Sequence, residues 1–392
     1  MLRAVWLVAA SLLVGFCTPL ADAQLVTIDP GIARSVTLSP AQRDEVRAFV
    51  DALKADVFGE DPVLARRAID NLLSPLHGEG VSVAFRQAMS DALAEPIADA
   101  IADERIWIEH EGRDRTLNAR PYTGLRLAGE IATDRTLGMI RRQLNNPDVG
   151  RRFFAIHAVE MVFFAVQTSA PAVTVDALYS GTGTSARGIV ADLGQRLADE
   201  DSPIHAAAIV RALGEAGRIS DSTMRGVATN AIRLIGQRTS DRIRARQDAG
   251  GDIQERKVWI TAGRVVFPVV AQTGGGTDEA TALSSIRLAG HLIAAVYRDV
   301  EQTRDGSPAG GDQIRTQMLE LAGNLLSFGE MRLADTQRRG PSKALEDAAG
   351  MLVDSFEGKG GNFRQIALSI ISKNGLLTDA PYRFRDDEFI GQ

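Results

Sequence analysis

Four polar residues in the second half of the chain recur at intervals of four: Arg225, Thr229, Arg233 and Gln237. Residues four apart are neighbours on a helix surface, so we expect these side chains to lie together, opposite an apolar stripe. A guanidinium group binds carboxylate or phosphate oxygens through paired hydrogen bonds. The row therefore predicts a surface that binds a protein or an acidic ligand. The alternative is an ordinary solvated helix face.

His157 and Glu160 lie three residues apart within the longest apolar stretch after the N-terminus, 153–166. Their spacing places both on one helix face, where they could bind a metal ion or transfer a proton. A metal site needs further ligands, and the five histidines are scattered without an H-E-x-x-H motif or a Cys/His cluster. We therefore predict a buried polar pair that binds neither a metal nor a cofactor.

The glycine-rich segment 181–188, GTGTSARG, has some features of a phosphate-binding loop. It lacks the Lys-Ser/Thr ending of a P-loop, and its third glycine is misplaced for a dinucleotide fingerprint. The sequence contains neither a G-x-S-x-G nor an S-x-x-K motif. We expect the acidic groups 103–104 and 386–388 to be solvated, and paired glycosidase carboxylates cannot be identified without a fold. No residue is therefore predicted to be catalytic.

The N-terminus has the three zones of a secretory signal peptide. Arg3 supplies the positive charge, and residues 4–16 form an apolar run too short to span a bilayer. The small residues Ala21 and Ala23 then precede a cleavage point. We expect cleavage after Ala23 and export to the periplasm or the extracellular space. The alternative is a buried N-terminal helix.

Export would leave a chain without cysteine, because Cys17 is the only one, and Phe16 before it argues against a lipoprotein anchor. The formal net charge of −6 argues against a nucleic-acid partner, and we expect the basic run 238–246 to be a solvated helix end. Apolar residues make up 45% and charged residues 24%, as in a folded globular protein. We expect no segment of transmembrane length once the signal is removed.

Helix signals dominate the rest of the sequence and predict an all-α fold. Four helices are expected to begin with a capping residue followed by proline, at Ser39-Pro40, Asp61-Pro62, Asn146-Pro147 and Ser202-Pro203. A short apolar-Arg-apolar-apolar-Gly pattern recurs inside the expected helices, with its glycine at 129, 214, 236 and 290. Glycine costs a helix about 1 kcal/mol relative to alanine, so its repetition indicates close helix packing or a helix end. Only the segment 106–110 alternates as a strand does.

Two consecutive helices are clearest between residues 197 and 237. The first begins at Ser202 and can end at Gly217, the second can be capped by Ser220 or Asp221, and each carries one apolar stripe. The run DSPIHAAA at 201–208, with Leu-Gly at 213–214, resembles a short bacterial HEAT repeat, and residues 146–151 resemble a more divergent repeat start. The resemblance implies an α-solenoid for binding or scaffolding, in which the second helix, 222–237, lines the concave surface. It transfers no catalytic residue.

We therefore expect an irregular HEAT-like solenoid over residues 119–375. An extended leader at 24–38 and a helical region at 39–118 precede it, and a tail at 376–392 follows. The alternative fold is a compact multi-helix domain. The expected function is non-enzymatic binding or scaffolding in the cell envelope. The alternatives are an exported helical enzyme, for example one acting on polysaccharide, and a subunit of an envelope complex.

Overall fold

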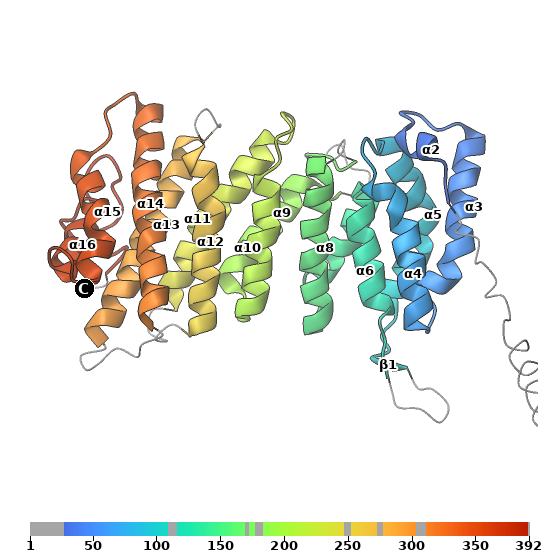
Figure 1. The fold of residues 1–392 in the computed structure, drawn as a ribbon, viewed down its shortest axis with the longest axis horizontal. Helices are drawn as coiled ribbons and strands as arrows, with labels where there is room; N and C mark the ends of the chain where they lie inside the picture. The colour runs from blue at the N-terminus through green and yellow to red at the C-terminus, as the bar shows by residue number, and fades with distance from the viewer. Residues whose placement is uncertain are drawn as a thin grey trace, which may run out of the picture. The chain divides into compact units, whose positions relative to one another are not determined.

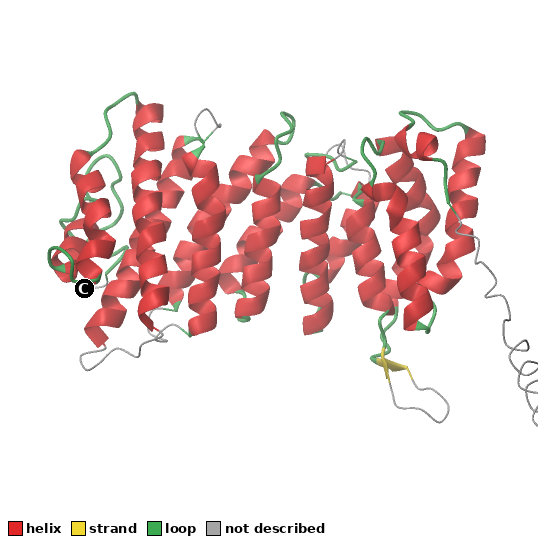
Figure 2. Cartoon of the chain, in the orientation of Figure 1, coloured by secondary structure: helices red, strands yellow, loops and turns green. Residues whose placement is uncertain are grey.

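The computed structural model describes residues 27–108, 116–168, 172–176, 183–246, 252–272, 277–302 and 311–390. Within these ranges the chain forms fifteen α-helices, one 3-10 helix and one two-stranded hairpin, which confirms the all-α prediction (Figure 2). The expected signal peptide, with Cys17, lies outside the described residues. The same is true of residues 177–182, where the glycine-rich segment begins, and of residues 109–110 at the end of the expected strand.

The chain forms two compact units, residues 1–96 and 97–392, and the boundary lies inside helix α5. The elements up to and including α5 are α2 (Pro30–Arg34), α3 (Pro40–Val57), α4 (Pro62–Leu73), the 3-10 helix η1 (Ser74–His77) and α5 (Val83–Ala102). Helix α2 lies within the segment 24–38, which we expected to be extended. Asp29 caps this helix, because its carboxylate accepts a hydrogen bond from the Gly31 N–H at 2.8 Å.

The helix starts of the first unit follow their predicted signals. Ser39 and Gln42 form a capping box: the Gln42 N–H donates to Ser39 Oγ at 3.3 Å, and the Ser39 N–H donates to Gln42 Oε1 at 2.9 Å. Asp61 caps α4 by accepting from the Val63 N–H at 2.8 Å. These bonds satisfy amide groups that have no partner inside the helix, and so they fix where α3 and α4 begin.

The second unit contains all the remaining elements. They are β1 (Trp107–Ile108), β2 (Thr116–Leu117), α6 (Arg120–Ile131), α7 (Asp134–Gln143), α8 (Val149–Thr168), α9 (Ala186–Asp199), α10 (Pro203–Gly217), α11 (Arg225–Ala245), α12 (Ile253–Ala271), α13 (Glu279–Gln302), α14 (Gly311–Gln337), α15 (Lys343–Phe356) and α16 (Phe363–Ile371). The two strands pair antiparallel, with Trp107 opposite Leu117, so the strand expected at 106–110 is present over its described residues.

The helices of the second unit pack in two rows (Figure 1). Helices α6, α8, α10, α12 and α14 contact one another in that order. Helices α9, α11 and α13 form the second row, and helices of the two rows also contact each other, as α10 contacts α11. Most contacts therefore join helices that are close in the sequence, and the core between the rows consists mainly of Ala, Leu, Ile and Val.

Three of the four recurring glycines, Gly129, Gly214 and Gly236, lie where helices of one row approach each other, whereas a Cβ atom added at Gly290 would meet the Phe389 ring. A Cβ atom added at Gly129 of α6 would lie 2.8 Å from the Ala158 carbonyl oxygen of α8. One added at Gly236 of α11 would lie 2.9 Å from the Ser284 carbonyl oxygen of α13. Both distances are too short for a side chain, so close packing of backbones, not a helix end, explains these two glycines.

The predicted starts of α10 and α8 have different outcomes. Ser202 caps α10 as predicted, since the His205 N–H donates to its hydroxyl at 3.4 Å. At Asn146-Pro147 the prediction is wrong, because α8 begins only at Val149. The Asn146 side chain accepts from the Asp148 N–H at 2.8 Å, and Asp148 then caps α8 by accepting from the Arg151 N–H at 2.7 Å. Two capping residues stand close together here, and the second one fixes the helix start.

Among the described residues, helix α13 is long and apolar enough to cross a membrane by length and composition. We expected no such segment after the N-terminus, and the longest apolar stretch that we identified, 153–166, is interrupted by His157 and Glu160. Of the most apolar stretch of 18 residues in α13, a share of 72% is buried within the structure. Core helices meet the same criteria, so the composition of α13 does not by itself indicate a membrane span.

Candidate functional site

Helix α11 carries the four residues predicted to form one binding row, but the structure divides them between two surfaces. Each residue turns by about 100° around a helix, so a spacing of four drifts by about 40° and a spacing of twelve by about 120°. Arg225 and Thr229, near the start of α11, line a pocket against α12. Arg233 lies outside this pocket and donates a hydrogen bond to Gln237 Oε1 at 2.9 Å. The candidate site is therefore the pocket that Arg225 and Thr229 line.

This α11–α12 pocket has a volume of about 550 Å³ and lies within the second unit. Its walls come from the ends of α10 and α12 and from the starts of α11 and α13. The apolar side is formed by Ile219, Ile232, Val265, Pro268 and Val269. The polar side chains are Arg218, Ser220, Arg225, Thr229, Gln272, Thr277 and Thr281. A pocket of this size with a few convergent polar groups fits a small ligand or the end of a larger one.

Arg225 is the charged group of the pocket that has no internal partner. Within the described part of the chain its guanidinium forms neither an ion pair nor a hydrogen bond, and the residue is exposed. Arg218, also in the lining, is instead bound to the Glu215 carboxylate one helical turn earlier. Arg225 therefore offers its five N–H donors to solvent or to a ligand, whereas Arg218 is already occupied.

Two threonine hydroxyls of the pocket lack hydrogen-bond partners among the described residues. Thr281 is 1% exposed, and its Oγ1 is buried without a partner, as is Oγ1 of Thr277. A buried hydroxyl without a hydrogen bond costs about 1–3 kcal/mol. The sequence carried no signal for these threonines, because they lie about fifty residues from Arg225 and reach the pocket only through the packing of α13 on α11.

The start of α11 adds to the positive character of the pocket. Met224 precedes the helix, and no side chain caps its N-terminus. We predicted that Ser220 or Asp221 would cap this helix. The Asp221 carboxylate does accept from the Thr223 N–H at 2.8 Å, but this bond lies in the turn before α11. A helix N-terminus carries partial positive charge, and Arg225 in the first turn increases it. An anion bound at this end would compensate both charges.

The predicted polar pair on α8 is present but not buried. His157 Nδ1 lies 3.0 Å from Glu160 Oε2, and the His157 side chain is 49% exposed. Arg211 of α10 lies 3.8 Å from the same carboxylate. The burial prediction failed because apolar residues predominate in α8 without gathering on one face, so periodicity did not show which face would meet solvent. Phe164, also on α8, is exposed as well, at 59%.

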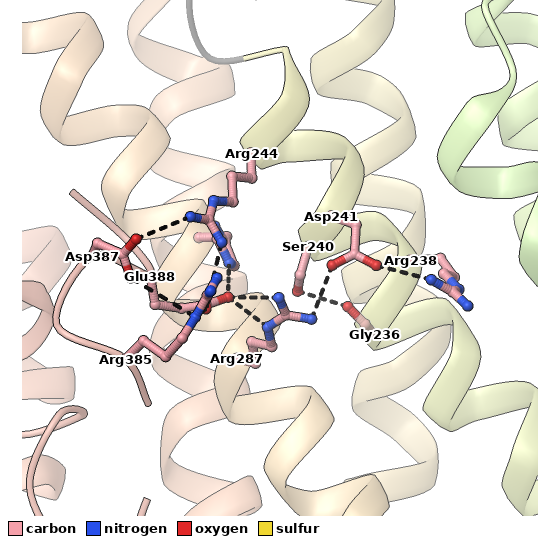
Figure 3. A network of polar contacts seen from close by, with 10 residues as sticks. Gly236, Arg238, Ser240, Asp241, Arg244, Arg287, Arg385, Asp387 and Glu388 are labelled. Carbon is pink, nitrogen blue, oxygen red and sulfur yellow. Dashed lines mark hydrogen bonds and ion pairs between the residues drawn. The ribbon is translucent and has the colours of Figure 1, made fainter. Parts of the chain in front are cut away.

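A second charged region, at the C-terminus, has nearly all its charges paired, and Figure 3 shows the contacts. We call it the Glu388 cluster. Glu388 is 4% exposed and bonds to Arg287 at 2.6 Å and to His291 Nε2 at 3.1 Å. The hydrogen bond from His291, with support from Arg287, lowers the pKa of Glu388 to about 2. Burial lowers the pKa of His291, so this histidine is neutral and donates its Nε2–H. The prediction that 386–388 is solvated is therefore wrong for Glu388.

The basic run 238–246 is also not a solvated helix end. The side chain of Arg242 is completely buried, and its Nη2 lies 2.5 Å from Glu255 Oε1 of α12. It also donates to the carbonyl oxygens of Leu197 and Glu200. Burying a guanidinium group is costly unless a carboxylate and further acceptors surround it, as they do here. Arg242 therefore joins α11 to α12 and to the end of α9.

Carboxylates also line a pocket of about 790 Å³ beside α9, and their partners bear on the alternative of an enzyme. Asp192 is bound by Arg141 at 2.7 Å, and Glu200 is bound by Arg196 at 3.1 Å. These two carboxylates are therefore already bound by arginines of the chain. Across the described ranges, no group of three His, Cys, Asp or Glu residues is placed to hold a metal ion.

Comparisons of the chain with protein-family models, with curated proteins and with solved structures give no match.

Proposed function

We propose that this chain is an exported, non-enzymatic binding protein of the cell envelope, built as an irregular HEAT-like solenoid. The support for the solenoid is the order of contacts in the second unit, where each helix packs mainly on helices near it in sequence. Gly129 and Gly236 add to this, because each permits close approach of two successive helices of one row. A stack of this kind presents a continuous surface to partners.

The α11–α12 pocket is the proposed binding site, and its ligand group is a carboxylate or a phosphate. One observation carries this proposal. Among the described residues, Arg225 has no partner within the chain, and the same pocket is lined by Thr277 and Thr281, whose buried hydroxyls have no hydrogen-bond partner. Arginine binds such anionic groups through two parallel hydrogen bonds, and hydroxyls donate to the remaining oxygens. The apolar side of the pocket would hold the aliphatic part of the partner.

A photo-cross-linking experiment in the producing cell tests this site. A photoreactive amino acid replaces Gln272, an exposed residue at the pocket, or Gln237, which lies on the other surface of α11. The proposal expects a discrete cross-linked partner from position 272 and not from position 237. Equal cross-linking from both positions, or none from 272 in folded protein, would contradict a binding role for the pocket.

Export is tested separately by mass spectrometry of the protein from the same cells. The proposal expects Gln24 as the first residue, with residues 1–23 removed. A chain that retains Met1 to Ala23 would contradict export while leaving the pocket intact as a site.

A further inference from the structure

The end of the chain lies on helix α13 and is buried there. After α16 the chain continues to Glu388 and Phe389, which are only 4% and 1% exposed. Phe389 packs against Gly290 of α13, where an added Cβ atom would lie 2.8 Å from the Cζ atom of the ring. That distance is too short for a side chain, so the glycine leaves room on α13 for an aromatic ring.

The contacts with α13 involve three successive groups of this C-terminal segment. The Glu388 carboxylate accepts from Arg287 Nε at 2.7 Å, and Arg287 Nη2 lies 2.6 Å from the same oxygen. His291 Nε2 lies 3.1 Å from that oxygen, and its ring meets the Phe389 ring edge-on at 5.0 Å between centroids. Arg298 donates to the Phe389 carbonyl oxygen at 2.8 Å. This face of α13 therefore recognises a carboxylate residue that is followed by an aromatic residue.

The receiving side of this contact is also held from α11. Arg287 Nη1 lies 3.1 Å from the Asp241 carboxylate of α11, and Arg244 of α11 lies 3.8 Å from the Glu388 carboxylate (Figure 3). Arg287 therefore keeps a partner that fixes its position when the Glu388 carboxylate is absent. Together with Arg298, these arginines favour an acidic segment on this face.

An exposed tether joins Glu388 to the preceding part of the chain. Tyr382 is 7% exposed, and its hydroxyl donates to Glu330 of α14 at 2.7 Å. Residues 385–387 lie between Tyr382 and Glu388 and are exposed. The printed sequence of this tether is Arg-Asp-Asp, and Asp387 makes only ion pairs of 3.5 and 3.8 Å. Two buried anchors are therefore separated by a short stretch that packs on nothing in the core.

We propose that this face of α13 binds a segment of a partner protein in which an acidic residue precedes an aromatic residue, and that Glu388 and Phe389 occupy it as an internal ligand. The internal ligand leaves by rotation within 385–387, while Tyr382 stays attached. A short tether holds an internal ligand at an effective concentration on the order of millimolar, so a partner binds only when it competes successfully. The site shares no residue with the α11–α12 pocket, where Arg225 is available without displacement.

Binding of a labelled peptide tests the proposal. The peptide has the sequence of residues 383–390, RFRDDEFI, and its binding to the full chain is measured by fluorescence anisotropy. Phe389→Ala weakens the internal ligand, so this variant should bind the peptide at least tenfold more tightly than wild type does. A second peptide that carries Glu388→Gln should bind the variant at least tenfold more weakly than the first. A variant that binds the first peptide no better than wild type does, or binds both peptides equally, would overturn the proposal.

Two glycine variants show whether the peptide occupies the predicted place. In the Phe389→Ala background, Gly290→Ala puts a methyl group where the ring lies and should abolish binding of the peptide. The matched control is Gly350→Ala on α15, because no described neighbour outside the local helix backbone lies within 4 Å of a Cβ atom there. This control should leave binding unchanged, and equal binding by the two glycine variants would contradict the assignment.

Circular dichroism of Phe389→Ala separates a releasable segment from a part of the core. The proposal expects the helical content of wild type, because only the C-terminal residues are released. A general loss of helix would show that the fold depends on Phe389, and it would overturn the proposal as well.

Discussion

The Glu388 cluster and the α11–α12 pocket contain similar groups but use them differently. Glu388 sits among Arg287, His291 and Arg385, so its charge is compensated by several donors. Arg225 in the pocket has no such partner among the described residues, and Thr281 beside it has an unbonded hydroxyl. Charges that hold the fold together are paired inside the chain. A charge left without an internal partner, next to buried polar atoms, is available to a partner from outside.

The largest effect is expected from Glu388→Gln. This change removes the buried carboxylate that binds Arg287 and His291. Arg287 is 21% exposed and keeps Asp241 at 3.1 Å, so the loss of unfolding free energy should lie at the lower end of the range for buried ion pairs, about 3 kcal/mol. Urea unfolding of the variant and of wild type measures the difference. The matched control is Asp387→Asn, because that side chain is 50% exposed and should change stability by less than about 1 kcal/mol. Equal effects of the two changes would contradict the distinction between the regions.

Acid should weaken the Glu388 cluster before it affects the pocket. The folded-state pKa of Glu388 is about 2, below its ordinary value of 4.5. Stability from this group is therefore present above pH 4.5 and is lost as the pH falls towards 2. Burial also lowers the pKa of His291 from 6.5, so unfolding takes up protons there below about pH 6.5 and stability falls in the same direction.

Unfolding measured between pH 7.5 and pH 3 checks this dependence. The difference in stability between wild type and Glu388→Gln should shrink as the pH falls below 4.5. A difference that stays constant over the whole range would show that the charge of Glu388 is not what stabilises the cluster.

Thr281→Val should raise stability slightly, by about 1 kcal/mol, because it replaces an unbonded buried hydroxyl by a methyl group of similar shape. The control is Ser285→Ala on the same helix, where the hydroxyl donates to the Ala282 carbonyl at 2.8 Å. That change should lower stability by about 1 kcal/mol. Thermal unfolding of both variants shows whether each one is more or less stable than wild type. A loss of stability in Thr281→Val would mean that the hydroxyl has a partner, and the pocket would lose one of its donors.

Local signals in the sequence predicted much of the fold. Ser39, Asp61 and Ser202 cap helices as expected, because a capping bond involves residues only two or three positions apart. The glycine pattern indicated close packing without showing which helices meet. At Asn146 the local rule was ambiguous, since Asp148 could serve as the cap equally well and does so.

The sites were harder to predict because they depend on contacts between distant residues. Arg242 looked like part of a solvated run, but Glu255 of the next helix makes its burial possible. His157 looked buried because most of its neighbours in the sequence are apolar. Of the residues that line the pocket, the sequence indicated only Arg225 and Thr229. The spacing of four residues also predicted one surface as far as Gln237, although positions four apart drift around the helix.

The central claim is that Arg225 is available to a partner, and a comparison of two arginines on one helix tests it most directly. Arg225→Ser and Arg233→Ser should each change unfolding free energy by less than about 0.5 kcal/mol, because neither side chain is in the core. Quantitative capture from an envelope extract is then measured with wild type and both variants, for the partner identified by cross-linking from position 272. We predict at least tenfold weaker capture by Arg225→Ser and nearly unchanged capture by Arg233→Ser, whose guanidinium is bound to Gln237. Undiminished capture by a folded Arg225→Ser variant would contradict the claim.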